Sequence, residues 1–247
     1  MSKIKVCGLR RPEDIEAVNK CKPDCVGFVF ANTRRFVSDE LAADLKSKLS
    51  DDIPAAGVFV NEPMEHIEKL VRSGTIDIVQ LHGKEDEAYV DHLRRMLPVG
   101  VPIWKAIRVE VDLTRFGVQA DEAQELSMEL TLEEERFRYA SAIVQLNSEI
   151  KRLMSENVFA DCFLFDSKVK GIPGGSGQNF DLASLPTDEE IGKFYFLAGG
   201  VGFGNIERIL RQRNPYGVDI STALETDGYK DPEKIERMVN IIRNYVN

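Results

Sequence analysis

Short apolar segments alternate with segments of helical spacing along the chain, and this alternation constrains the fold more than any other feature. The candidate strands are residues 3–7, 25–30, 55–60, 76–81, 103–107, 162–165, 194–198 and 216–220. Helical spacing or capping residues mark residues 12–19, 38–49, 63–71, 86–97, 205–213 and 231–245. Alternation of this kind predicts a parallel sheet with a helix in each connection.

The closed form of such a sheet is favoured over the open form. Several strands are apolar on both faces, as in residues 26–30, which is typical of a sheet covered by helices. Eight strand–helix units in 247 residues indicate a single (β/α)8 TIM barrel. Gly200, Gly202 and Gly204 alternate singly and lack the rest of the G-x-G-x-x-G fingerprint, which argues against a dinucleotide-binding fold. We therefore expect one catalytic domain over residues 1–247.

The interval 110–160, after the fifth strand, departs from this rhythm. A connecting helix with its loops needs only about 20 to 25 residues. The interval carries eleven acidic and five basic residues, and so most of the chain's net charge of −9. One helical stripe within it comprises Tyr139, Ile143, Leu146, Ile150 and Leu153. We expect an acidic helical insertion whose stripe packs on the barrel. A helix that joins two chains or binds a partner is the alternative.

Charge and hydropathy exclude several kinds of partner. A net charge of −9 and a sequence pI of about 5.0 give no electrostatic footprint for nucleic acid or an anionic membrane. No apolar run approaches the roughly 20 residues of a membrane span, and the first residues lack the apolar stretch of a signal peptide. We therefore expect a cytoplasmic protein.

The cysteines predict neither a disulfide framework nor a metal site. Cys7, Cys21, Cys25 and Cys162 are too few and too irregularly spaced for a disulfide framework in a chain of this length. Cys21 and Cys25 flank three residues, but no second His or Cys pair follows at a zinc-site spacing. We interpret both as packed thiols.

Polar residues and glycines follow the candidate strands. The active-site groups of a TIM barrel come from the carboxyl ends of its strands, so these residues are expected on one rim. They are Cys7 and Gly8, residues 32–35, Asn61, residues 80–83 and 105–108, Asp166 and Ser167, Gly199 and Gly200, and residues 219–222. The rim thus combines a thiol, a carboxylate, an imidazole and a guanidinium.

The loops after the last strands predict a phosphate site. Residues 198–201 and 219–222 follow the last two strands, the usual position for a phosphate held by backbone N–H groups in α/β barrels. Residues 171–177 form a third, glycine-dense segment that is long enough to close over a ligand. A surface loop without such a role is the alternative for that segment.

In order and approximate spacing, the strand-end motifs resemble those of the phosphoribosylanthranilate isomerase family, barrel enzymes of tryptophan biosynthesis. The motifs are KVCG (5–8), VGFVF (26–30), RRFVS (34–38), GVFVN (57–61), VQLHG (79–83), LFDS (164–167), GGSG (174–177), LAGG (197–200) and GVDIS (217–221). The resemblance covers residues 3–109 and 161–245. Ala223 is a departure, because the family commonly has glycine there. If that position needs a positive φ, alanine would alter the phosphate site.

The resemblance implies an intramolecular oxidoreductase of the aldose–ketose isomerase type that needs no cofactor and no metal. Its reaction is the Amadori rearrangement of N-(5-phosphoribosyl)anthranilate to 1-(2-carboxyphenylamino)-1-deoxyribulose 5-phosphate. By resemblance, Asp166 is the general acid and Cys7 the general base. Asp166 must then keep its proton near neutral pH, for which Phe165 and Asp219 are the expected causes. Cys7 needs nearby N–H groups or cations to lower its pKa from about 8.5.

The resemblance also implies binding residues. Arg35 would pair with the anthranilate carboxylate, a task suited to a planar bidentate donor. Gln80, His82 and Asp219 would contact the substrate, although His82 is equally well interpreted as a structural imidazole. The phosphate would lie at Gly175, Gly199, Gly200, Ser221 and Thr222. The expected partner is this small substrate, and the protein is expected to be a monomer or a homodimer.

Two other functions fit the sequence less well. A related barrel enzyme of histidine synthesis would offer a carboxylate where Cys7 stands. A non-catalytic scaffold would act through the acidic helix of the interval 110–160. Cys7 and Asp166 together argue against both.

Overall fold

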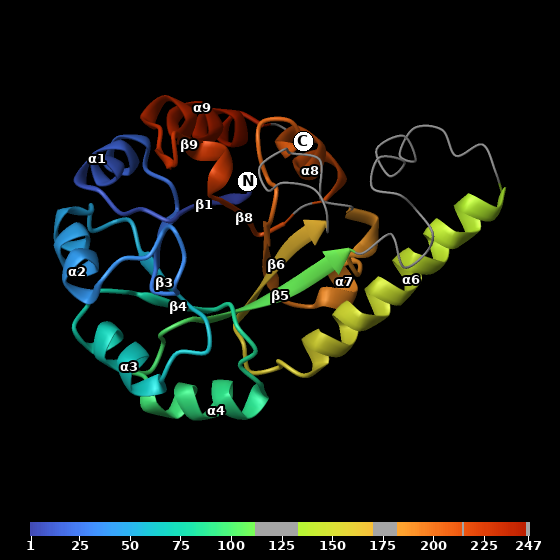
Figure 1. Cartoon of the computed structure of the whole chain (residues 1–247), viewed down its shortest axis with the longest axis horizontal. Coiled ribbons are helices and arrows are strands. Elements are labelled where there is room, and N and C mark those ends of the chain that lie inside the picture. Colours follow the sequence, from blue (N-terminus) through green and yellow to red (C-terminus); the bar gives the residue numbers. More distant parts are fainter. Residues whose placement is uncertain (112–132, 170–181, 214, 246–247) are drawn as a thin grey trace.

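Eight parallel strands close into a barrel, with β1 hydrogen-bonded to both β2 and β8 (Figure 1). The computed structural model describes the chain except residues 112–132, 170–181, 214 and 246–247, and the side chains of residues 109–111, 133–139 and 167–169. The strands are β1 (Lys3–Cys7), β2 (Cys25–Val29), β3 (Ala55–Phe59), β4 (Ile78–Leu81), β5 (Ile103–Val111), β6 (Cys162–Val169), β7 (Phe194–Ala198) and β8 (Gly217–Ile220). The prediction of a TIM barrel is confirmed.

Helices surround the barrel on its outside (Figure 1). They are α1 (Pro12–Cys21), α2 (Asp39–Lys48), α3 (Met64–Arg72), α4 (Glu87–Met96), α6 (Glu133–Ser155), α7 (Asp188–Ile191), α8 (Ile206–Gln212) and α9 (Pro232–Arg243). The side chains of Ser38, Asp86 and Asp231 cap α2, α4 and α9 by accepting hydrogen bonds from backbone N–H groups of the first turn. For these three helices, the caps explain why the expected start agrees with the structure to within a residue.

The alternation of side chains along each strand divides the core into two layers. The outer layer fills the space between strands and helices and contains Val6, Val26, Phe163 and Phe165. The inner layer fills the barrel and comprises Cys25, Ala56, Ile78, Trp104, Ala106, Cys162, Leu164, Phe196 and Ala198. The barrel is therefore packed below its rim, and only the carboxyl ends of the strands can hold a ligand.

Strands β5 and β6 are longer than the sequence predicted. Their register runs from Trp104 opposite Cys162 to Val111 opposite Val169, and the two arrows extend side by side in Figure 1. The interval 110–160 was expected to begin outside any strand. That boundary was wrong, because residues 110 and 111 complete β5.

Helix α6 packs against β5 and the 3-10 turn η2 (Leu182–Ser184), and its amino-terminal part extends away from the barrel (Figure 1). Ile150 is 1% exposed within the outer layer, and Leu146 and Leu153 pack against that layer. Packing of the stripe on the barrel is confirmed for these three residues. The side chain of Tyr139 and residues 112–132 lie outside the described part of the chain.

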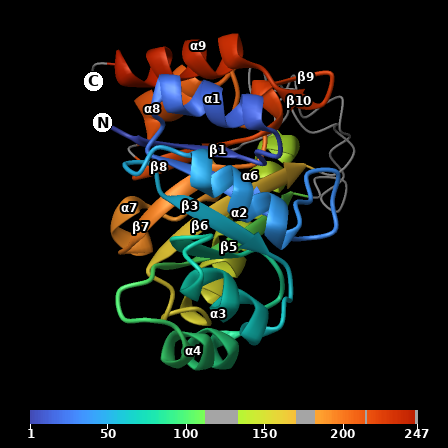
Figure 2. The same cartoon turned by 90° about the vertical axis from the view of Figure 1, so that its left-hand side faces the viewer.

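A short hairpin after β8 was not predicted. The 3-10 turn η3 (Thr222–Leu224) leads into β9 (Glu225–Thr226) and β10 (Tyr229–Lys230), beside the ends of α1 and α9 (Figure 2). Asp227 and Gly228 at its turn both have a positive φ, as a two-residue type I′ turn requires. The Asp-Gly pair was therefore the available sequence signal.

Among the described residues, no helix is both long enough and apolar enough to span a membrane.

Candidate active site

A cavity of about 550 Å³ opens at the carboxyl ends of the strands. Every strand contributes to its lining, through Cys7, Val29, Val58, Gln80, Arg108, Asp166, Ala198 and Asp219. Predicted site residues that line it are Cys7, Arg35, Gln80, His82, Asp166, Gly199, Gly200, Asp219, Ser221 and Thr222. Gly175 and the segment 171–177 lie outside the described residues. The barrel thus brings together all the predicted site residues that are described.

Cys7 lies at the end of β1 above a buried ion pair. Lys5, two residues earlier on the same face, is fully buried and donates a hydrogen bond of 2.8 Å from Nζ to Asp219 Oδ2. Gly27 on β2 leaves the space that both side chains need. A Cβ at Gly27 would lie 2.7 Å from Cys7 Sγ and 3.2 Å from Lys5 Nζ. The thiol and the ammonium group are therefore close neighbours on the inner wall.

The electrostatics around Cys7 are mixed. Burial raises the pKa of the Cys7 thiol, and the Asp219 carboxylate raises it further. The ammonium groups of Lys5 and Lys230 lower the pKa of Cys7, but the net direction is upward. The cations that the Cys7 thiolate was expected to need are therefore present. They do not outweigh burial and Asp219.

Asp166, at the rim end of β6, contacts His82. The distance between His82 Nε2 and Asp166 Oδ2 is 2.9 Å, and the distance between Gln80 Nε2 and His82 Nδ1 is 3.1 Å. Gln80 thus contacts one ring nitrogen of His82 and Asp166 the other. Gln80, His82 and Asp166 form one chain of polar contacts along the cavity wall.

The neighbours expected to keep Asp166 protonated are engaged elsewhere. Phe165 lies in the outer layer, where its ring contacts Phe163 and Tyr195. Asp219 is paired with Lys5. The expectation for Phe165 was wrong because consecutive side chains of a strand point to opposite faces. The observed polar neighbour of Asp166 is His82.

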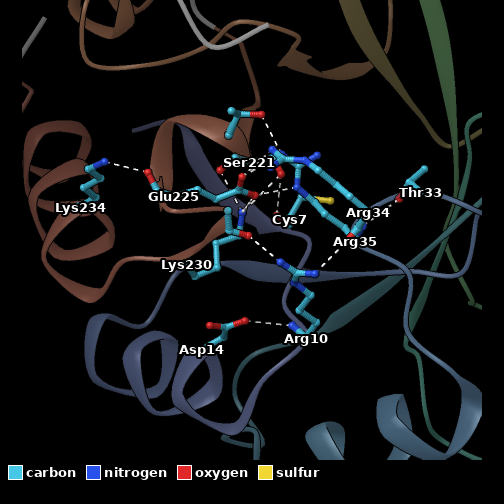
Figure 3. A network of polar contacts seen from close by, with 12 residues as sticks. Cys7, Arg10, Asp14, Thr33, Arg34, Arg35, Ser221, Glu225, Lys230 and Lys234 are labelled. Atoms are coloured by element: carbon cyan, nitrogen blue, oxygen red, sulfur yellow. Dashed lines mark hydrogen bonds and ion pairs between the residues drawn. The ribbon is translucent and has the colours of Figure 1, made fainter.

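Arg35 crosses the rim from the loop after β2 and is held by Glu225 (Figure 3). Its Nε donates to Glu225 Oε1 at 2.7 Å and its Nη2 to Glu225 Oε2 at 3.2 Å, while Nη2 also donates to Thr222 Oγ1 at 2.8 Å. Gly8 has a φ of +86°, and a Cβ there would lie 2.4 Å from Arg35 Cδ. Glycine is thus required at position 8 both by its backbone and by the close approach of Arg35.

Glu225 and Lys230 were not predicted as parts of the site. Lys230 Nζ lies 3.0 Å from Glu225 Oε1 and donates to Ser221 O at 2.9 Å (Figure 3). Ser221 Oγ in turn donates to Cys7 O at 2.9 Å. Burial alone raises the pKa of Glu225, but Arg35 and Lys230 lower it to about 2. The hairpin after β8 therefore connects the rim arginine to the backbone of Cys7.

The loops at the proposed phosphate position have the backbone expected of them. Gly199 and Gly200 have φ values of 73° and 75°, which glycine adopts readily. The side chain of Asn205 holds this loop by donating to Gly200 O at 3.0 Å. Ala223 lies in η3, and its φ is not positive. The concern that alanine would strain this position was therefore unfounded.

Within the described residues, no group of three or more His, Cys, Asp or Glu side chains is arranged to hold a metal ion. A thiol and a carboxyl group that line one cavity are groups that can exchange protons with a bound molecule. Fold and site together define an acid–base enzyme of the (β/α)8-barrel class.

Comparison with known proteins specifies the family. A sequence model described as N-(5'phosphoribosyl)anthranilate (PRA) isomerase matches residues 4–132 and 119–241. The N-(5'-phosphoribosyl)anthranilate isomerase of Thermoanaerobacter sp. (strain X514) is 36% identical over 243 residues, which cover 98% of each chain. That of Clostridium acetobutylicum is 36% identical over 248 residues, covering 99% of this chain and 100% of the relative. The chain belongs to the phosphoribosylanthranilate isomerase family, and its activity is the aldose–ketose isomerisation of tryptophan biosynthesis, EC 5.3.1.24.

Solved structures agree with this assignment. The crystal structure of phosphoribosyl anthranilate isomerase from Thermotoga maritima has a TM-score of 0.72 at 25% identity, covering 99% of this chain and 100% of that one. The isomerase from Pyrococcus furiosus has a TM-score of 0.68 at 24% identity and supports the fold.

Proposed function

We propose that Asp166 is the general acid and Cys7 the general base of the isomerisation. The division of roles follows the family resemblance, and the observation that supports it is that both side chains, from β6 and β1, line one cavity of about 550 Å³. Asp166 would protonate the furanose ring oxygen as the bond from that oxygen to C1 breaks, which leaves a Schiff base at C1. Cys7 would then take the proton from C2, and the resulting enolamine would tautomerise to the ketone.

Cys7 can act as a base only as a thiolate. The groups that favour the thiolate are the ammonium groups of Lys5 and Lys230, which oppose burial and the charge of Asp219. We propose that these two buried lysines supply the positive potential that the base requires. Lys5 acts from the same strand, and Lys230 acts from β10 behind Ser221.

The remaining lining residues would bind the substrate. Arg35 would take the anthranilate carboxylate, because it is the planar donor held at the rim. Gln80 Oε1 and Asp219 Oδ1 are buried oxygens that have no hydrogen-bond partner in the described part, so they can accept from substrate hydroxyl or amine groups. Together with His82, these residues would contact the sugar and the anthranilate. The phosphate would lie at Gly199, Gly200, Ser221 and Thr222. Gly175, which is outside the described residues, would complete this set.

A related structure supports the substrate class. A phosphoribosyl anthranilate isomerase of 22% identity and TM-score 0.66 was solved in complex with reduced 1-(o-carboxyphenylamino)-1-deoxyribulose 5-phosphate. For this chain, we propose the corresponding phosphorylated sugar–anthranilate as substrate.

We further propose a single catalytic domain over residues 1–247 with an acidic helical insertion at about 110–160. The two matches to the family's sequence model meet within this interval, at residues 119–132. The isomerase of Thermotoga maritima is described as dimeric, and we propose a monomer or homodimer in the cytoplasm.

The experiment that tests the proposed function follows the fluorescence of phosphoribosylanthranilate as purified protein consumes it. Turnover by the wild type and its loss in both Cys7→Ser and Asp166→Asn are expected. An inactive wild-type protein would refute the proposed substrate, and an active Cys7→Ser or Asp166→Asn variant would refute the role of that residue.

A further inference from the structure

Glu225 lies behind the active site and has no part in the acid–base steps. Its side chain is 5% exposed, and it does not line the cavity. The carboxylate instead accepts from three cations: Arg35, Arg34 at 2.6 Å, and Lys230 at 3.0 Å (Figure 3). The buried ammonium group of Lys230 holds this buried carboxylate in one place, so Glu225 can fix the orientation of a partner that reaches the cavity.

Arg35 is the partner that reaches the cavity. Glu225 takes the Nε–Nη2 edge of its guanidinium group, and Thr222 Oγ1 accepts the other hydrogen bond from Nη2. No acceptor among the described residues bonds to Nη1 of Arg35. The contacts of Nε and Nη2 therefore fix the plane of the guanidinium group, and the N–H donors of Nη1 remain for a ligand.

Orientation before binding matters because a free arginine side chain loses considerable rotamer entropy when a ligand orders it. Here, two contacts order the side chain in advance. Gly8 allows the aliphatic part of Arg35 to pass at close range, and Glu225 then fixes the head group.

We propose that Glu225 is a positioning residue for substrate recognition, which presents the free N–H donors of Arg35 to the aromatic carboxylate of the substrate. This inference rests on the proposed function, because it takes the carboxylate to be that of anthranilate. Glu225 touches no substrate atom in this arrangement and acts only through Arg35.

Two ligands that differ in one group isolate this role. The first is reduced 1-(o-carboxyphenylamino)-1-deoxyribulose 5-phosphate, and the second is the same compound with an unsubstituted phenylamino group. Calorimetric titration of each gives two dissociation constants, and their ratio measures the contribution of the carboxylate alone. Lys230 contacts Ser221 at the proposed phosphate end, so an effect that passes through Lys230 and Ser221 changes both constants alike and cancels in the ratio.

Glu225→Gln should reduce the preference for the carboxylate ligand, measured as the ratio of the two dissociation constants, by about tenfold. The neutral amide has only one acceptor oxygen, so it cannot accept from both Nε and Nη2 of Arg35. Glu225→Asp keeps the charge on a shorter side chain and should lose less of the preference. In an Arg35→Lys background, Glu225→Gln should reduce the preference no further, since its effect passes through Arg35.

Arg34→Gln is the matched control. It removes a cation from the same carboxylate, but Arg34 is 52% exposed and does not line the cavity. The preference should remain as in the wild type.

The proposal is overturned if Glu225→Gln and Glu225→Asp weaken both ligands equally or leave the preference unchanged. Should Glu225→Gln fail to fold, the comparison of Glu225→Asp with Arg34→Gln decides in the same way. A wild-type protein that binds both ligands but does not turn over phosphoribosylanthranilate would contradict the proposed function and leave the role of Glu225 to be judged from the ratio.

Discussion

His82 Nε2 lies 2.9 Å from Asp166 Oδ2, although 84 residues separate the two positions along the chain. Gln80 contacts the other ring nitrogen of His82, so the imidazole is held on both sides. This arrangement fixes the carboxyl group of Asp166 at the rim. It also gives His82 a structural task that is compatible with contacting the substrate.

Replacement of His82 by Asn should therefore lower kcat more than it raises KM. The shorter side chain cannot span the distance from Gln80 to Asp166, and a misplacement of the acid by about 1 Å can cost on the order of 10²-fold in rate. Steady-state kinetics with phosphoribosylanthranilate measure this change. An unchanged kcat with a raised KM would show that His82 only binds substrate.

Cys7→Ser and Asp166→Asn should each lower kcat by roughly 10²- to 10⁴-fold, the usual contribution of a positioned proton-transfer group. Both changes nearly conserve side-chain volume, so circular dichroism and the midpoint of thermal unfolding should stay close to those of the wild type. Turnover near the wild-type rate in either variant would exclude that residue from proton transfer.

Lys230→Gln should move the pH dependence of kcat/KM. Lys230 lowers the pKa of Cys7 in the folded protein, so its removal raises that pKa further. A base works in its deprotonated form, and the rise of activity with pH should therefore occur at higher pH in the variant. Rates from about pH 6 to 10 measure the shift.

Lys20→Gln is the control for this pH experiment, because Lys20 forms an exposed ion pair with Glu236 on the outer helices. Its pH profile should match that of the wild type. A Lys230→Gln profile that coincides with the wild-type profile would contradict the electrostatic role of Lys230.

Ile150→Asp should destabilise the barrel by several kcal/mol, because Ile150 is 1% exposed in the outer layer and an aspartate there would bury an unpaired charge. Val144 lies on the same helix and is 64% exposed, so Val144→Asp should change the stability little. Urea unfolding measures the free energy of unfolding of both variants. If instead the stripe joins two chains, light scattering should show a dimer that dissociates in Ile143→Asp but not in Val144→Asp, and that result would overturn packing on the barrel as the role of the stripe.

The sequence by itself was sufficient for the barrel and for the rim residues. Strand and helix periodicity is a local property, and eight alternations leave few topologies. Because parallel strands point the same way, each strand-end residue, such as Cys7, Gln80 or Asp166, was expected on one rim, and all three line the cavity. Strand alternation also excludes Phe165 from the cavity once Asp166 is placed there, because consecutive side chains of a strand point to opposite faces.

Only the tertiary structure decided which charges meet. Lys5 pairs with Asp219 across 214 positions of sequence, and Arg35 pairs with Glu225 across 190. These partners depend on the closure of β1 against β8, which no local pattern encodes, and on where the hairpin after β8 packs against the rim. The pKa of Cys7 depends on the same kind of contact. Burial and Asp219 raise it by more than Lys5 and Lys230 lower it, and both Asp219 and Lys230 are distant from Cys7 in sequence. Electrostatic energy is set by distance and burial in three dimensions, so the residues of the site could be read along the chain while their charge state could not.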